Sequence, residues 1–349
     1  MAVSSGTVSA ERRSFETALP RLAESLRVAG IIGAGDGLVI ERQFDAGQSN
    51  PTYLLCAGGR RLVLRKQPHG QLLPRAHDVV REHDIMQALH GAGLPVPHPL
   101  LASRDKGILG TDFFVMAYVP GTVYSDPALP DCSADKRAAA YRSMAETLAR
   151  LHRIDPAVLA RAGINPRGDF VGRQIGVWRT AYLAAQTAPD DRIEAVGRWL
   201  IENKPARENT GVVHGDYRIE NLIFEAGEVA AVLDWELCTI GEPLADLAYC
   251  CIWHHLPGSA FHGLADKNLA ALGIPSEAEL IDIYEQASGI GAAPTHCYFL
   301  TFAFYRLAAI LQGVYRRALD GNAASPLALE RGKVAALCLE TAARLAAGR

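Results

Sequence analysis

Two carboxylates and an amide stand at fixed spacing in the second half of the chain. Asp216 and Asn221 are five residues apart, and Asp234 follows thirteen residues after Asn221. Each lies beside a short apolar or β-branched run, which indicates neighbouring strand ends. A general base, an amide oxygen and a second carboxylate in such a place could hold a hydroxyl nucleophile and a magnesium ion together. The spacing therefore predicts phosphoryl transfer from a nucleotide.

A hairpin is expected to bring these groups together. Residues 222–224 and 229–233 are apolar, and the polar segment 225–228 separates them, so the hairpin would return Asp234 to Asn221. Asp216 would then accept the proton of a substrate hydroxyl, or orient it. Asn221 would offer an oxygen to magnesium without adding charge, and Asp234 would bridge the ion to the phosphates.

Three short strands, at about 38–45, 52–56 and 61–66, precede this region. The turn between the first two contains Gly47, Ser49 and Asn50. Small residues in a hairpin turn can bring backbone N–H groups close to phosphate oxygens. The alternative is an ordinary turn, because glycine and asparagine are common turn residues.

The third strand and the helix expected at 76–91 predict a buried ion pair. Strand alternation puts Val63 and Arg65 on one face and Lys66 on the other. Glu82 falls on the apolar stripe of the helix, and a carboxylate there needs a partner. Arg65 or Lys66 would be that partner, unless Glu82 lies at the edge of the stripe in water.

The apolar segment 113–119 is expected to be a strand that ends at Pro120. Backbone groups around Met116 and Tyr118 would be open to hydrogen bonds with a flat base. The alternative is an ordinary edge strand that ends in a turn.

The remaining patterns predict a small sheet-rich lobe and a larger helical lobe. We assign residues 1–36 to an N-terminal helical segment, whose helix spans about 11–30, residues 37–119 to the small lobe, and 120–349 to the helical lobe. Apolar residues at helical spacing predict further helices at 133–153, 170–187, 190–203, 243–254, 276–288, 294–319 and 325–346.

Composition argues against several kinds of partner. With 349 residues, a net charge of -3 and no run of Lys and Arg, the chain lacks the electrostatic footprint of a nucleic-acid-binding protein. No uninterrupted apolar run approaches the roughly 18 residues of a membrane span. Seven cysteines without a CxxC pair argue against a disulfide framework or a zinc site, and fit the cytoplasm. A monomer and a homodimer are both compatible with the sequence.

The string 214–221, with His214, Asp216 and Asn221, resembles the catalytic loop of protein-kinase-like enzymes, in which a metal-binding aspartate follows. With Leu233-Asp234-Trp235-Glu236 the match is closest to the aminoglycoside phosphotransferase and choline kinase branch. The longer strings 214–221, 233–241 and 243–249 are similar to the kinase-like domain joined to some acyl-CoA dehydrogenases. Segments 305–315 and 321–325 extend the likeness.

This resemblance implies an α+β, two-lobed protein-kinase-like fold with a small antiparallel-sheet lobe and a larger, mainly helical one. It implies that Asp216 is the catalytic base and that Asn221 and Asp234 bind magnesium. Arg65 takes the place of the usual phosphate-pairing lysine. His214 and Asp246 are expected to be structural anchors. The residues implied at the nucleotide are Gly47, Ser49, Asn50, Val63, Arg65, Glu82, Met116 and Tyr118.

The expected activity is transfer of the γ-phosphate of ATP, with GTP left open, to a hydroxyl of a small molecule. The family likeness suggests a hydroxyacyl-CoA or a hydroxy acid as acceptor. An aminoglycoside or an amino alcohol is the alternative, but Arg306, Arg316 and Arg317 in the helix at 294–319 favour an anionic or neutral acceptor. A non-catalytic pseudokinase module is the alternative from another class, and the presence of Asp216, Asn221 and Asp234 argues against it.

Overall fold

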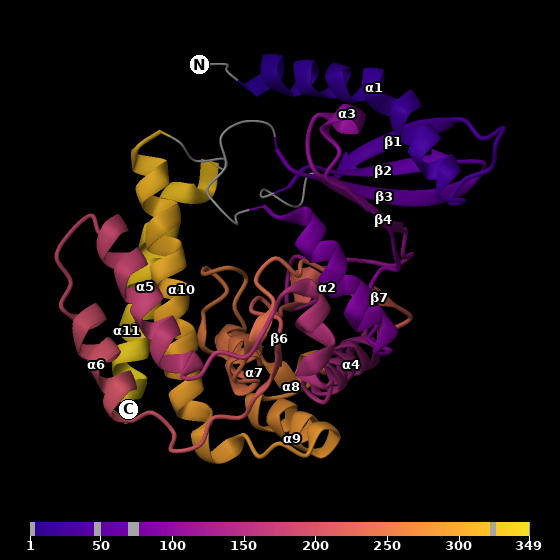
Figure 1. Ribbon diagram of the computed structural model, residues 1–349. Helices are drawn as coiled ribbons and strands as arrows, with labels where there is room; N and C mark the ends of the chain where they lie inside the picture. The colour runs from indigo at the N-terminus through magenta and orange to yellow at the C-terminus, as the bar shows by residue number, and fades with distance from the viewer. Residues whose placement is uncertain (1–3, 45–49, 69–76, 322–325, 349) are drawn as a thin grey trace. The chain divides into compact units, whose positions relative to one another are not determined.

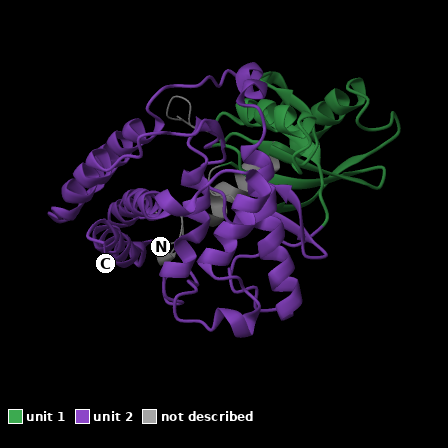
Figure 2. Ribbon diagram, turned by 90° about the horizontal axis from the view of Figure 1, so that it is seen from below, with its two compact units in different colours: residues 1–120, 233–236 green, residues 121–232, 237–349 purple. Residues whose placement is uncertain are grey.

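The computed structural model describes residues 4–44, 50–68, 77–321 and 326–348. The chain forms two compact units (Figure 2), one made of Met1–Pro120 with Leu233–Glu236 and the other of Gly121–Val232 with Leu237–Arg349. The fold is α+β, with an antiparallel sheet in the first unit and mostly helices in the second. The short segment that carries Asp234 therefore packs with the sheet-containing unit, although the sequence assigns it to 120–349.

The first unit is built on a five-stranded antiparallel sheet with the order β1-β2-β3-β5-β4. The predicted strands are present, and the sequence missed β4, which begins at Pro99. Proline is tolerated as the first residue of an edge strand, since no ladder hydrogen bond is lost there. The strands are β1 Leu38–Phe44, β2 Thr52–Ala57, β3 Arg60–Lys66, β4 Pro99–Ser103 and β5 Phe113–Ala117.

One face of this sheet is covered by α1 (Ser4–Val28), which lies across the strands together with the short α3 (Lys106–Leu109) (Figure 1). Leu22 and Leu26 of α1 share a buried apolar cluster with Leu62 and Leu64 of β3. The helix begins earlier than predicted and continues through Pro20. Because Leu62 and Leu64 face α1, strand alternation turns Val63 and Arg65 toward the opposite face.

The helix α2 (Val79–Gly91) begins at the N-cap Asp78, whose carboxylate accepts a hydrogen bond from Arg81 N at 3.1 Å. The predicted apolar stripe is confirmed, because Val79, Glu82, Met86 and Leu89 are all buried. Glu82 therefore enters the interior of the unit with its stripe.

The second unit is mainly helical. In this unit α10 packs against α11, α5 and α7, and Figure 1 shows the long α10 beside α11 and α5. The predicted helices are present with boundaries shifted by a few residues, and the short α8 was not expected. The helices are α4 Ala134–His152, α5 Phe170–Ala185, α6 Arg192–Glu202, α7 Leu244–Cys251, α8 Leu269–Leu272, α9 Glu277–Ser288, α10 His296–Leu319 and α11 Arg331–Ala346.

Single 3-10 turns supplement these helices. They are η1 Pro156–Ala162, η2 Ile219–Asn221, η3 Ile252–His255, η4 Ala293–Thr295 and η5 Pro326–Leu329.

Two small antiparallel pairs hold the loop 214–221. The strand β6 (Gly211–Val213) pairs with β9 (Thr239–Gly241), and β7 (Leu222–Glu225) pairs with β8 (Glu228–Val232). The predicted hairpin is therefore present, and its turn residues Ala226 and Gly227 have φ of 53° and 88°. Positive φ at both turn positions suits a tight two-residue hairpin. The loop leaves the end of β6 and returns into β7.

One helix among the described residues is long and apolar enough to cross a membrane by length and composition, namely the helical stretch Ala293–Leu319 with a mean hydropathy of 1.4. Within the protein, 78% of the apolar 18-residue window in this stretch is buried. Burial inside the helical unit accounts for its apolar character, as in a core helix.

Candidate active site

The loop between β6 and β7 fixes the carboxylate of Asp216. Asn221 Nδ2 donates to the backbone oxygen of Asp216 at 2.8 Å and to its Oδ2 at 2.9 Å. Arg218 Nε lies 3.3 Å from the same Oδ2. Since the amide nitrogen of Asn221 is occupied by Asp216, its oxygen is the atom left to bind a cation.

Asp246 on α7 anchors the beginning of this loop. Its two carboxylate oxygens accept hydrogen bonds from His214 N at 2.6 Å and Gly215 N at 2.9 Å. The ring of His214 in turn accepts from Asp216 N, with Nδ1 at 3.1 Å. The predicted structural roles of His214 and Asp246 are confirmed, because both act on the backbone that carries Asp216.

Asp246 is completely buried and still favours its charged form. Burial alone would raise its pKa, but the charge of His152, whose Nε2 lies 3.5 Å away, the charge of His214 and the Gly215 N–H together lower the pKa below its usual value. His152 is itself positioned by Tyr284, whose hydroxyl lies 2.7 Å from its Nδ1. The anchor is therefore a complete set of donors around a negative charge.

Three further side chains in the helical unit surround the loop. Arg306 on α10 donates to the backbone oxygen of Gly215, and its guanidinium carbon lies 5.3 Å from the Trp178 ring centroid and 4.9 Å from that of Tyr249. Tyr249 on α7 lies near Asp216, and burial together with the charge of Asp216 raises the pKa of its phenol. Arg306 Nε and Trp178 Nε1 are buried and have no hydrogen-bond acceptor among the described residues.

In the sheet-containing unit, Arg65 joins two carboxylates. Arg65 Nε lies 3.0 Å from Glu82 Oε2, and Arg65 Nη2 donates to Asp234 Oδ1 at 2.9 Å. The first contact is an ion pair without hydrogen-bond alignment. The sequence left Arg65 and Lys66 open as partners of Glu82, and the structure selects Arg65. Lys66 follows it on the opposite face of β3 and is almost completely buried.

The surroundings of Glu82 are unfavourable to its charge. Burial, assisted by the charges of Asp234 and Glu236, raises the pKa of Glu82 to about 7 in spite of Arg65. Asp234 also has a backbone φ of 64°, in the left-handed region that few residues other than glycine adopt. Strained backbone of this kind is common at functional sites.

The structure also describes four other residues that the sequence predicts at the nucleotide. Val63 and Met116 are cross-strand neighbours on β3 and β5 and are both nearly buried. Asn50 is buried, with its Oδ1 3.2 Å from His77 Nδ1. Tyr118 follows β5, and its N–H donates to Arg61 O at 3.4 Å.

Two points qualify the predicted nucleotide contacts. The N–H groups of Ala117 and Tyr118 already donate to backbone oxygens, so this segment is less open to a base than the sequence indicates. Gly47 and Ser49 lie outside the described residues.

The structure thus brings Arg65, Glu82 and Asp234 together in one unit, and Asp216 and Asn221 together in the other. Sequence reasoning assigned no role to Arg218, Tyr249 or Trp178. The signals for the first two were their places within the matched strings 214–221 and 243–249. No comparable signal marked Trp178.

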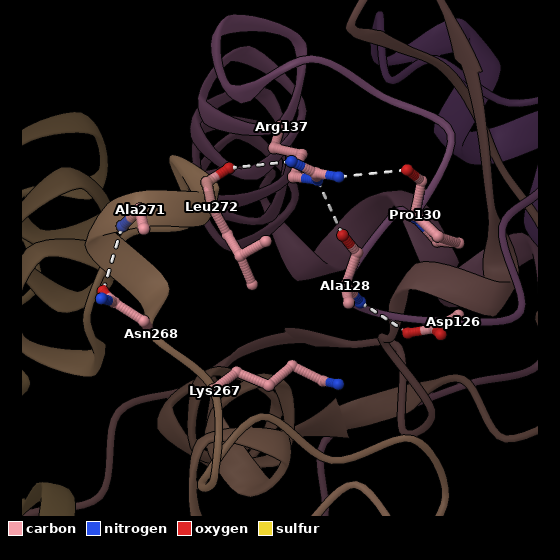
Figure 3. Close-up of a pocket in the computed structure, with 8 residues that line it drawn as sticks. All are labelled: Asp126, Ala128, Pro130, Arg137, Lys267, Asn268, Ala271 and Leu272. Atoms are coloured by element: carbon pink, nitrogen blue, oxygen red, sulfur yellow. Dashed lines mark hydrogen bonds between the residues drawn. The ribbon is translucent and has the colours of Figure 1, made fainter.

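A cavity of about 520 Å³ lies elsewhere in the helical unit, beside α8 and the start of α4 (Figure 3). None of the predicted site residues lines it. Arg137, which does, donates to the backbone oxygens of Ala128, Leu129, Pro130 and Leu272, so its guanidinium acts as a clamp on this part of the chain.

The chain belongs to the phosphotransferase enzyme family, whose model matches residues 41–294. It is 42% identical over 322 residues to mouse acyl-CoA dehydrogenase family member 10, covering 91% of this chain and 30% of the mouse protein. The chain spans between 30% and 39% of the length of that relative and of the chicken family member 11. The resemblance to this group of kinase-like domains is therefore confirmed.

Two solved structures share the fold. A crystal structure from Ralstonia eutropha JMP134, provisionally named an aminoglycoside phosphotransferase, is 34% identical, with a TM-score of 0.84, and covers 94% of this chain and 98% of its own. A mutant aminoglycoside phosphotransferase APH(4)-Ia in a ternary complex with ADP and hygromycin B is 17% identical, with a TM-score of 0.61 and coverage of 94% and 99%. The predicted protein-kinase-like fold is confirmed.

Proposed function

We propose that the chain is a magnesium-dependent kinase that transfers the γ-phosphate of ATP to a hydroxyl of a small molecule, with Asp216 as the base. The observation that carries this proposal is the orientation of the Asp216 carboxylate by Asn221 Nδ2, at 2.9 Å from Oδ2. A base held in one orientation beside an amide oxygen suits a reaction that depends on positioning. That the related APH(4)-Ia structure holds ADP together with hygromycin B supports the use of ATP.

Magnesium fits the donor set on chemical grounds. Asn221 has its amide nitrogen committed to Asp216, and Asp234 brings a partly exposed carboxylate. Oxygen donors of these two kinds are the ligands that Mg²⁺ prefers. Bound there, the ion would neutralise phosphate charge, while Arg65, held by Glu82, would offer its planar donors to the phosphates.

The acceptor we propose is a hydroxyacyl thioester or a hydroxy acid. Arg306 Nε and Trp178 Nε1 are donors without a protein acceptor, and Arg306 adjoins the loop that carries Asp216. Buried donors favour a carbonyl or carboxylate oxygen over the ammonium groups of an aminoglycoside or amino alcohol. The identity to an acyl-CoA dehydrogenase family member also supports an acyl substrate.

The test is consumption of magnesium-ATP with a panel of hydroxyacyl-CoAs, hydroxy acids, amino alcohols and aminoglycosides. We expect turnover with the first two classes, and Asp216→Asn should lower kcat by about 100-fold to 10,000-fold while ATP still binds. Glu225→Gln, on the exposed end of β7, serves as the matched control. Turnover that survives Asp216→Asn would exclude Asp216 as the base, and a response to aminoglycosides alone would overturn the proposed acceptor.

A further inference from the structure

A second group of reactive side chains lies in the helical unit and plays no part in the proposed phosphoryl transfer. Cys251 ends α7, His255 ends η3, Glu277 begins α9 and His296 begins α10. The ligand atoms of Cys251, Glu277 and His296 all lie within 4.8 Å of one another. Four side chains that bind metals well therefore come from the ends of adjacent helices.

The fourth side chain, His255, contacts this group through Glu277. His255 Nε2 lies 3.0 Å from each Glu277 oxygen, and His296 Nε2 lies 2.8 Å from Oε1. Cys251 and His255 are four residues apart, at the ends of the consecutive elements α7 and η3. Both imidazoles thus direct the ring atom that most often binds metals toward the same carboxylate.

We propose that Cys251, His255, Glu277 and His296 form a binding site for a zinc ion. A thiolate, two imidazoles and a carboxylate make a set of four ligands of the kind that tetrahedral Zn²⁺ accepts. Ligand atoms around such an ion are about 3.3–3.7 Å apart, since the bonds are about 2.0–2.3 Å long. The separations of 2.8 Å and 3.0 Å from Glu277 would need to open by only a few tenths of an ångström, while His255, which lies outside the mutually close group of Cys251, Glu277 and His296, would need to turn toward the ion.

The burial of the group suits an enclosed metal site with an entry route. The thiol of Cys251 is fully buried, while the side chain of Glu277 keeps 26% of its exposure and that of His255 keeps 23%. An ion can therefore reach the carboxylate and imidazole first and then displace the thiol proton, which leaves to solvent as the sulfur binds. The soft thiolate with imidazole favours zinc over magnesium.

This site would connect the helices that support the catalytic loop. The helix that ends at Cys251 carries Asp246 and Tyr249, and the helix that begins at His296 carries Arg306. A bound ion would hold these ends together and so act as a structural element of the helical unit. No CxxC pair marks it in the sequence, because the ligands come from three separate segments.

The test uses the full chain, stripped with a chelator and dialysed, with excess Mg²⁺ present and with neither nucleotide nor acceptor. After incubation with zinc, we expect the chain to retain about one zinc ion per chain through desalting, and the bound zinc to raise its Tm. Cobalt should give the intense spectrum of a tetrahedral ion, with a thiolate charge-transfer band. Cys251→Ser should remove that band, and His296→Gln should lower the retained zinc at least about tenfold. Cys338→Ser, a buried cysteine on α11, is the matched control.

Because the readout is the metal alone, its outcome does not depend on the proposed kinase activity. A wild-type chain that retains no zinc after desalting would overturn the site. A cobalt spectrum that lacks the thiolate band would do the same, and this measurement does not require any variant to fold. Equal zinc retention in His296→Gln and Cys338→Ser would show that His296 is not a ligand, and would therefore exclude the proposed four-ligand site.

Discussion

Glu82 in the sheet-containing unit and Asp246 in the helical unit are both buried carboxylates, yet their surroundings act in opposite directions. Glu82 shares its site with Asp234 and Glu236, and its pKa rises to about 7. Asp246 is surrounded by His152, His214 and backbone N–H groups, and its pKa falls. Burial raises the pKa of both, so the difference comes from what each carboxylate faces.

The contrast distinguishes Asp246, whose charge is balanced by groups of the protein, from Glu82, whose surroundings suit a bound ligand. Every donor around Asp246 comes from the protein, so its charge is stable without any other molecule. Around Glu82, the neighbouring carboxylates of Asp234 and Glu236 repel its charge, while Arg65 attracts it. A cation bound beside these carboxylates would reduce their repulsion, in agreement with the magnesium ion that we propose at Asp234.

The largest effect is expected from removing the carboxylate of Asp246. Asp246→Ala leaves the N–H groups of His214 and Gly215 without their acceptor and His152 without its ion-pair partner, so the free energy of unfolding should fall by about 3–5 kcal/mol. Urea unfolding measures this change. The exposed Asp282→Ala on α9 is the control and should change the free energy by less than about 0.5 kcal/mol. A loss as small as that in Asp246→Ala would mean that the anchor contributes little to stability.

A smaller effect is expected at the glycine that Asp246 holds. Gly215 has a φ of 88°, and a Cβ there would lie 2.9 Å from Leu237 Cβ and from its backbone oxygen. Gly215→Ala should therefore cost about 1–3 kcal/mol and lower kcat, because the strained residue precedes Asp216. Gly176→Ala on α5, where nothing lies within 4 Å, is the control. Equal stability of the two variants would show that the loop does not need the left-handed conformation.

The candidate site could be predicted as far as its residues lie close in sequence or on one regular element. Asp216 and Asn221 share a single loop, and strand alternation with helical periodicity gave the pair Arg65 and Glu82 its correct faces. The strand β4 was missed because prolines at 95, 97 and 99 suppress a strand signal.

Contacts between distant segments were beyond reach of the sequence. The donors that Arg306 and Trp178 bring near the loop come from α10 and α5, and neither spacing nor composition relates them. The cluster at Glu277 likewise joins separate segments, so no local sequence pattern marks it. Tertiary packing alone assembles such groups, and periodicity describes only one element at a time.

The smallest effect tests the charge of Glu82 directly. Since its pKa is raised from 4.5 to about 7, the folded chain binds a proton that the unfolded chain releases between these pH values. The free energy of unfolding should therefore fall as the pH rises through this window, and Glu82→Gln should remove that slope, which is of the order of 1 kcal/mol per pH unit. Urea unfolding at a series of pH values measures it, with the exposed Glu225→Gln as control. If Glu82→Gln kept the full slope, the titrating group would be another carboxylate beside Arg65, and the contrast with Asp246 would no longer depend on Glu82.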